Sequence, residues 1–252
     1  MYRNRLIPIL LLQNKSLVKT VKFNNFVYIG DPCNTVRIFN ELEVDELLFL
    51  DIKASPNDQE INYEILREIS DECFMPLGYG GGIKNLDEAK KIFDIGFEKF
   101  SLNTSIHNDE KLLYQITSIY GSQAVIVSID VKYNFFGKPQ VYTCGGRKNT
   151  KLDPVQFARK VESLGAGEIL LTSIDREGTW DGLDLKLIRE VVQSVNIPVI
   201  ANGGVGNLEH INHALESCSL SAVGTGSMVV FQKKGMGVLV NFPKIEEKHT
   251  FY

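Results

Sequence analysis

Short apolar runs alternate with longer amphipathic stretches along the chain. The apolar runs predict eight strands, at Leu6–Leu12, Leu47–Asp51, Pro76–Tyr79, Lys99–Leu102, Ala124–Asp130, Glu168–Thr172, Pro198–Ala201 and Ser221–Val223. The amphipathic stretches predict helices between them, at Pro32–Leu42, Glu60–Asp71, Leu86–Ile95, Asp109–Tyr120, Pro154–Leu164, Leu185–Val195 and Leu208–Glu216. Strands that alternate with helices are typical of βα units around a parallel sheet.

The same order of short motifs occurs twice along the chain, 122 residues apart. Four pairs share this offset: Asp31-Pro32 with Asp153-Pro154, Glu46–Phe49 with Glu168–Leu171, Gly80–Asn85 with Asn202–Asn207, and Ser101–Ser105 with Val223–Ser227. A period this long does not suit a solenoid, but it suits half of a barrel. We therefore predict one α/β domain over residues 1–252, a (βα)8 TIM barrel built from two homologous half-barrels at about 1–122 and 123–252.

Composition narrows the class of protein. The 252 residues are 44% hydrophobic, which supports a large core, and the net charge of −4 argues against sequence-independent nucleic-acid binding. The four cysteines have no CxxC spacing, which favours unpaired thiols in a reducing cytoplasm. The run Leu6–Leu12 is too short to span a membrane, so we expect a cytoplasmic protein. Nothing in the sequence predicts a metal or an organic cofactor.

Glycine-rich segments follow the third and seventh predicted strands. Gly80–Gly82 and Asn202–Gly204 would let backbone N–H groups approach an anion closely. Asn103-Thr104 and Gly226-Ser227 follow the fourth and eighth strands, which end at the same face of a barrel. Plain turns would also use glycine, but the duplicated pattern favours two phosphate sites and a ligand with an anionic group at each end.

Three acids stand at or just beyond the ends of predicted strands: Asp51, Asp130 and Asp175. Asp130 is the best candidate for proton transfer, because its position in a barrel faces the reaction. For Asp51 and Asp175, the alternative that the acid only holds loop backbone is nearly as strong as a role in proton transfer. The internal repeat places Leu11 opposite Asp130, where paired acid/base chemistry would need a second carboxylate.

Charged residues stand at the opposite ends of four strands. Arg5, Glu46, Lys99 and Glu168 each begin an apolar run, and if they point inward they form a ring of alternating charge across the barrel floor. One interpretation is a salt-bridged plug, since buried charges must be paired. The other is a polar gate, through which a small molecule enters from a partner docked below.

Five runs resemble the cyclase subunit of imidazole glycerol phosphate synthase: Asp45–Ile52, Gly80–Ile83, Ser101–Thr104, Gly121–Val125 and Gly165–Thr179. The resemblance covers nearly the whole chain. It implies a (βα)8 barrel that receives ammonia from a glutaminase subunit bound at its N-terminal face and conducts it along the barrel axis. Such cyclases use the ammonia to convert a bisphosphorylated ribulosyl-carboxamide into imidazole glycerol phosphate and an aminoimidazole carboxamide ribotide.

The resemblance also assigns roles to residues. One phosphate would be held by Gly82, Asn103 and Thr104, and the other would be framed by Glu177, Gly178, Gly204, Gly226 and Ser227. Glu177 replaces the usual aspartate. Asp130 matches one of two catalytic aspartates, and Leu11 stands at the other. Lys19 matches a lysine of the mobile first loop, and the four charged residues at the floor match the ammonia gate.

Two further segments, Leu17–Phe23 and Val238–Pro243, are more similar to a cyclase-like branch from surface-glycan pathways. That resemblance implies a barrel that supplies ammonia to a separate amidotransferase, which converts an acetamido sugar into an acetamidino sugar. Leu11 fits this branch, because an ammonia donor need not close a ring. A working cyclase of histidine biosynthesis is the alternative. A phosphoribosyl-formimino isomerase is a lesser one, since it needs no glutaminase and leaves the charged ring unexplained.

Overall fold

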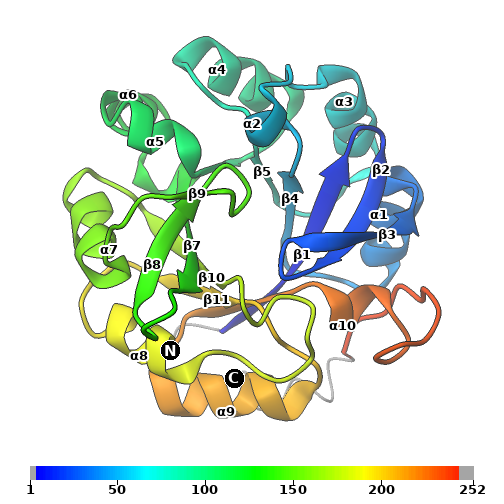
Figure 1. Ribbon diagram of the computed structural model, residues 1–252. Coiled ribbons are helices and arrows are strands. Elements are labelled where there is room, and N and C mark those ends of the chain that lie inside the picture. The colour runs from blue at the N-terminus through cyan, green and yellow to red at the C-terminus, as the bar shows by residue number, and fades with distance from the viewer. Residues whose placement is uncertain (1–3, 244–252) are drawn as a thin grey trace.

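Eight parallel strands close into a barrel in the computed structural model, which describes residues 4–243 (Figure 1). The strands are β1 (Arg5–Gln13), β4 (Leu47–Asp51), β5 (Leu77–Gly80), β6 (Lys99–Leu102), β7 (Val125–Tyr133), β10 (Glu168–Ser173), β11 (Val199–Asn202) and β12 (Ala222–Thr225). Parallel pairing of β12 with β1, from Ala222 opposite Arg5 to Thr225 opposite Pro8, completes the circle. The predicted barrel fold is confirmed, and the ends of the predicted domain, 1–3 and 244–252, lie outside the described residues.

Helices surround the barrel on the outside (Figure 1). They are α1 (Pro32–Glu41), α2 (Ala54–Asn57), α3 (Tyr63–Glu72), α4 (Leu86–Ile95), α5 (Thr104–Asn108), α6 (Lys111–Tyr120), α7 (Pro154–Ser163), α8 (Leu185–Val192), α9 (Leu208–Cys218) and α10 (Ser227–Val230), with a 3-10 turn at Ser122–Ala124. Asp31 and Asp153 cap α1 and α7, and a proline takes the first helical position in both. No helix of residues 4–243 is long and apolar enough to cross a membrane.

The strands are buried on both faces, so the barrel has two cores. Along β10, Leu170 points into the barrel, whereas Ile169 and Leu171 pack outward against the helices. The inner cluster lies in the lumen and consists of Ile7, Ile9, Leu11, Val18, Leu48, Ile126, Leu170, Ile200 and Ala222. A continuous apolar run such as Ile169–Leu171 is expected of a parallel strand that is covered on both sides.

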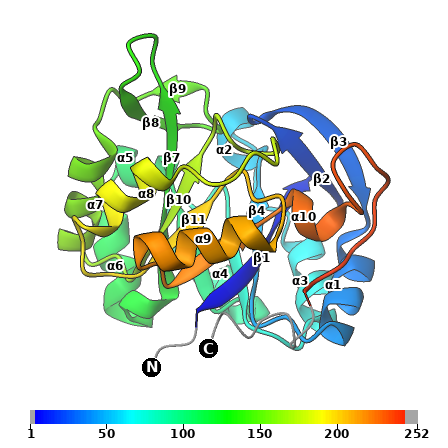
Figure 2. The same cartoon turned by 90° about the horizontal axis from the view of Figure 1, so that it is seen from below.

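Two hairpins that the sequence did not predict rise from the C-terminal mouth of the barrel (Figure 2). The first is formed by β2 (Ser16–Val21) and β3 (Asn24–Gly30), and the second extends β7 through β8 (Pro139–Thr143) to β9 (Lys148–Asn149). The first hairpin turns at Lys22 and Phe23, whose φ angles are 53° and 62°. Glycine or asparagine usually marks such a left-handed turn, so the usual signal is missing.

The two glycine clusters adopt similar backbone conformations. Gly81 and Gly82 have φ angles of 119° and 75°, and Gly203 and Gly204 have angles of 94° and 103°. These values lie in the region that residues with a Cβ rarely adopt, which explains glycine at these four positions. The origin of the barrel from two half-barrels stays a prediction.

Candidate functional site

A pocket of about 140 Å³ opens at the C-terminal mouth of the barrel. Its lining includes Gly82, Asn103 and Thr104, which we call the first cradle. Asp130 and Leu11 line the same pocket, so the structure brings these five predicted residues together. The pocket is therefore the candidate ligand site of the barrel.

Asp130 is oriented by the side chain of Asn103. The amide Nδ2 of Asn103 donates to Asp130 Oδ2 (3.2 Å) and to the carbonyl oxygen of Ser128 (3.0 Å). Burial raises the pKa of Asp130 to about 7, and the negative charge of Glu177 contributes to the rise. A carboxyl group with a pKa near neutrality can donate or accept a proton under ordinary conditions, as general acid/base chemistry requires.

This raised pKa predicts a pH dependence of stability. Between its ordinary value of 3.8 and about 7, Asp130 holds a proton in the folded state that it loses in the unfolded state. The free energy of unfolding therefore falls as the pH rises through this window. Asp130→Asn removes the effect, so we expect its melting temperature relative to the parent to be higher at about pH 8 than at about pH 5, by roughly 4–8 °C or about 2 kcal/mol. Thermal unfolding at both pH values tests this.

Asp71→Asn on the exposed side of α3 makes the same change of charge and is the control for that measurement. It should follow the parent at both pH values. An Asp130→Asn protein that also follows the parent would show that the carboxyl is already ionised at about pH 5.

The other two acids have structural duties. Asp51 Oδ1 accepts from the backbone N–H groups of Lys53 (2.9 Å) and Ala54 (3.1 Å). Asp175 Oδ2 accepts from the backbone N–H of Tyr133 (2.9 Å). Asp51 thus holds the loop after β4, as the alternative interpretation proposed, whereas Asp175 holds the backbone at the end of β7.

The pocket also contains residues that the sequence did not single out. Phe23 and Phe26 reach it from the first hairpin, and Arg147 reaches it from the turn between β8 and β9. A Cβ on Gly146 would lie 3.0 Å from the ring of Phe23, so the hairpin spans the mouth and touches that turn. Lys53 Nζ lies 4.4 Å from the centre of the Phe26 ring. Only the pair Gly145-Gly146 before Arg147 could have indicated a tight turn at this place.

The remaining predicted phosphate residues lie on the other side of the mouth. We call Glu177, Gly178, Gly204, Gly226 and Ser227 the second cradle. Lys19 Nζ reaches it from β2 and pairs with Glu177 Oε1 at 3.2 Å, and both side chains are buried. The structure therefore brings Lys19, Glu177 and Gly226 together, since a Cβ on Gly226 would lie 2.1 Å from Lys19 Nζ.

The other members of the second cradle contact neighbouring backbone. A Cβ on Gly178 would lie 2.2 Å from the carbonyl oxygen of Thr20, so only glycine permits the hairpin to approach this loop. A Cβ on Gly204 would meet the carbonyl oxygen of Gly182 at 2.3 Å. Ser227 is buried at the start of α10.

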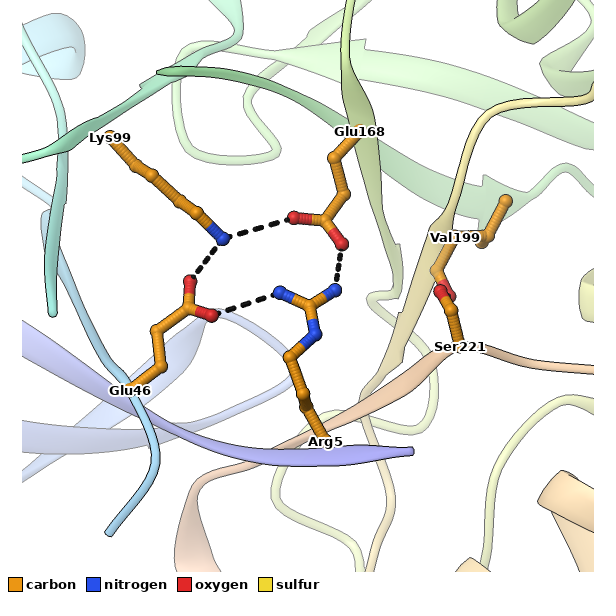
Figure 3. A network of polar contacts seen from close by, with 6 residues as sticks. All are labelled: Arg5, Glu46, Lys99, Glu168, Val199 and Ser221. Atoms are coloured by element: carbon orange, nitrogen blue, oxygen red, sulfur yellow. Dashed lines mark hydrogen bonds and ion pairs between the residues drawn. The ribbon is translucent and has the colours of Figure 1, made fainter. Parts of the chain in front are cut away.

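A closed ring of charges lies at the N-terminal floor of the barrel (Figure 3). Arg5 pairs with Glu46 at 2.9 Å and with Glu168, and Lys99 pairs with the same two acids at 2.7 and 3.4 Å. The residues stand at or just before the starts of β1, β4, β6 and β10, so the predicted alternation of charge is observed. Ser221 Oγ bonds the carbonyl oxygen of Val199 (3.3 Å) beside the ring.

The cations of the ring are more accessible than its acids. The side chains of Arg5 and Lys99 are 27% and 20% exposed, against 5% and 7% for Glu46 and Glu168. Burial alone would lower the pKa of the Arg5 guanidinium, but its bonds to the two glutamates raise that pKa above the usual value. The Arg5 guanidinium therefore stays charged, and the ring presents polar groups at the floor of the barrel.

Residues 5–234, which include every strand of the barrel, match the family described as histidine biosynthesis protein. The chain belongs to this family. A relative from Pseudomonas aeruginosa, "Putative imidazole glycerol phosphate synthase subunit hisF2", is 46% identical over 98% of both chains. One from Vibrio vulnificus, "Putative imidazole glycerol phosphate synthase subunit hisF3", is 41% identical over 98% of this chain and 96% of its own. Imidazole glycerol phosphate synthase subunit HisF of Hydrogenobaculum sp. is 38% identical over 99% of both.

These relatives confirm the resemblance to the HisF-type subunit of imidazole glycerol phosphate synthase. The family match and the closed eight-stranded barrel agree on the fold. The catalytic, phosphate-binding and gating roles of individual residues in this HisF-type barrel remain predictions.

Proposed function

We propose that this HisF-type barrel conducts ammonia within a glutamine-dependent amidotransferase complex and passes it to a separate enzyme that forms an amidine on a sugar. The observation that carries the proposal is the closed charged ring of Arg5, Glu46, Lys99 and Glu168. It is the feature of the floor that a glutaminase docked at the N-terminal face would meet. An isomerase has no glutaminase partner, so the charged ring would have no function in such an enzyme.

The interior above the ring suits neutral ammonia. The lumen cluster is apolar, so it accepts a small uncharged molecule more readily than an ion. At its upper end, the hydroxyl groups of Ser101 and Ser128 are hydrogen-bonded at 2.6 Å, and both line the mouth pocket. Ammonia that passes the ring would therefore leave the lumen beside Asp130.

The mouth favours delivery of ammonia over ring closure. Of the two carboxylates among the described pocket-lining residues, Asp51 is held by two backbone N–H groups, which leaves Asp130 for proton transfer. Leu11 occupies the position of a second acid and cannot transfer a proton. An amidine on a sugar requires only that nitrogen be supplied to an amide that another enzyme activates.

A working cyclase is the second candidate, and one observation favours it. Asp130 keeps a pKa of about 7 and a defined bond to Asn103, as a catalytic acid would need. On this view the protein would make imidazole glycerol phosphate with a single carboxylate.

Reversal of one charge in the ring tests the proposal. In the complex with its glutaminase and acceptor enzyme, Lys99→Glu should lower the amidated product formed per glutamine hydrolysed by about tenfold or more, because Glu46 and Glu168 lose a shared partner. The measurement is the ratio of product to glutamate. Lys99→Met, which removes the charge without adding an acid, should show a smaller loss.

Lys90→Glu on the exposed side of α4 is the matched control and should leave the ratio unchanged. If the Lys99→Glu complex delivers ammonia as efficiently as the parent, the ring is a structural plug and the proposal fails.

A further inference from the structure

We infer that the two hairpins at the C-terminal mouth form the surface on which the acceptor enzyme docks, and that this enzyme presents an acidic surface with an apolar recess. The inference rests on the proposed function, since it says where the enzyme that receives the ammonia binds. Ammonia released into open water would be protonated and diluted. An acceptor that takes it from the barrel therefore has to cover the mouth.

Two phenylalanines project from the tip of the second hairpin, which extends beyond the rest of the molecule at the mouth (Figure 2). Phe135 is 98% exposed and Phe136 is 82% exposed. Their rings contact each other edge to face, with centroids 5.6 Å apart. Adjacent apolar side chains that project together into solvent mark a contact site more often than isolated ones do.

The backbone of this tip is fixed, so the two rings are held outward. Asn134 Oδ1 accepts from the backbone N–H groups of Phe136 (2.9 Å) and Lys138 (3.0 Å). The backbone N–H of Asn134 donates to the carbonyl oxygen of Lys138 at 2.9 Å. A preformed turn loses less conformational entropy on binding than a mobile loop does. Two phenylalanine rings bury about 300–500 Å², a large part of the roughly 800 Å² that each partner contributes to a stable interface.

Both hairpins are basic although the chain as a whole is acidic. Residues 16–30 and 131–152 contain no aspartate or glutamate, whereas the net charge of the chain is −4. Their exposed basic side chains, none of which forms an ion pair within residues 4–243, are Lys22, Lys132, Lys138, Arg147, Lys148 and Lys151. Lys132 lies on the same face of β7 as Asp130, because side chains two residues apart along a strand point the same way. Positive charge at the mouth attracts an acidic partner and repels a basic one.

The basic and apolar residues are continuous with the mouth pocket. Arg147 and Phe26 line the pocket from the two hairpins. Next to Phe26 on β3, Val27 and Tyr28 are 50% and 64% exposed. Within residues 4–243, β3 pairs only with β2, so its other edge is open. An open apolar strand edge is a ready site for another chain, and an acceptor seated on both hairpins would enclose the mouth.

Binding of the purified acceptor enzyme to the barrel alone, measured by surface plasmon resonance, tests the inference. The double variant Phe135→Ser and Phe136→Ser should weaken binding by about tenfold or more, because it removes the apolar contact. The double variant Lys132→Glu and Lys138→Glu should slow association by about tenfold at low salt, and added salt should reduce this difference. All four side chains are exposed, so the melting temperatures should match that of the parent.

Two substitutions outside the hairpins are the matched controls. Tyr114→Ser removes an aromatic ring that is 68% exposed on α6, and Lys90→Glu reverses an exposed charge on α4. Both proteins should bind the acceptor as the parent does. The hairpin variants should still bind the glutaminase, because its proposed site lies at the opposite end of the barrel.

Three results would overturn the inference: a parent that does not bind the acceptor at micromolar concentrations, hairpin variants that bind it as tightly as the parent, or a parent that sediments with vesicles of phosphatidylcholine and phosphatidylglycerol but does not bind the acceptor. These outcomes are distinct from the Lys99→Glu result. If docking is observed but the Lys99→Glu complex delivers ammonia as efficiently as the parent, only the proposed function fails. If Lys99→Glu uncouples delivery but the hairpin variants bind normally, only the docking surface is wrong.

Discussion

Supplied with ammonium chloride and the bisphosphorylated ribulosyl-carboxamide, the protein is expected to form imidazole glycerol phosphate about 10²–10⁴-fold more slowly than a cyclase with two acids. The reason is the leucine at position 11, which shares the mouth pocket with Asp130 and offers no proton. Chromatographic quantification of both products over time gives the rate. Turnover within tenfold of the two-acid enzyme would contradict the proposed function and favour the working cyclase.

The kinetic constants identify the cause of a low rate. Loss of a proton-transfer group lowers kcat, because that group acts in the transition state, so the difference should appear in kcat rather than in KM.

Arg5→Met is expected to lower the free energy of unfolding by about 3–5 kcal/mol, as for other broken buried ion pairs. Glu46 and Glu168 are buried, and without Arg5 they share the single cation of Lys99. Denaturant unfolding at neutral pH measures the loss. A loss below about 1 kcal/mol would mean that water reaches the floor and screens the acids.

Two further variants show where that loss of stability comes from. Arg67→Met, at an exposed position of α3, should change stability by less than about 0.5 kcal/mol. The combination of Arg5→Met, Glu46→Gln, Lys99→Met and Glu168→Gln should cost less than Arg5→Met alone, because it leaves no unpaired charge. A larger loss in the combined protein would show that the ring stabilises the barrel outright.

The barrel was predictable because its strands are buried on both faces. A run such as Ile169–Leu171 is apolar at every position, and the stretches between such runs show the period of amphipathic helices. The type and the order of the elements could therefore both be predicted. The charged ring was predictable for a related reason. In a parallel barrel, residues at the starts of the apolar runs, such as Arg5 and Glu46, all lie at the floor. Their side chains then face one another across the lumen.

The arrangement at the mouth could not be predicted in the same way. The pair of Lys19 and Glu177 joins residues 158 positions apart, and it depends on how the first hairpin folds over the barrel. That hairpin turns at Lys22 and Phe23, so it carries no glycine signal. For Asp51 and Asp175 the sequence left two interpretations open, and only the structure shows that backbone N–H groups donate to these carboxylates.

Leu11 also bears on how this barrel can evolve. Its neighbours across the strands, Val18 and Leu50, are apolar, and its side chain belongs to the lumen cluster. An aspartate introduced there would lose packing and enter a site that disfavours its charge, so it would arrive both destabilising and largely protonated. A single substitution would therefore not recover a paired acid, and selection would have to pass through a less stable protein first. The apolar lumen thus opposes the gain of an acid at position 11 by a single substitution.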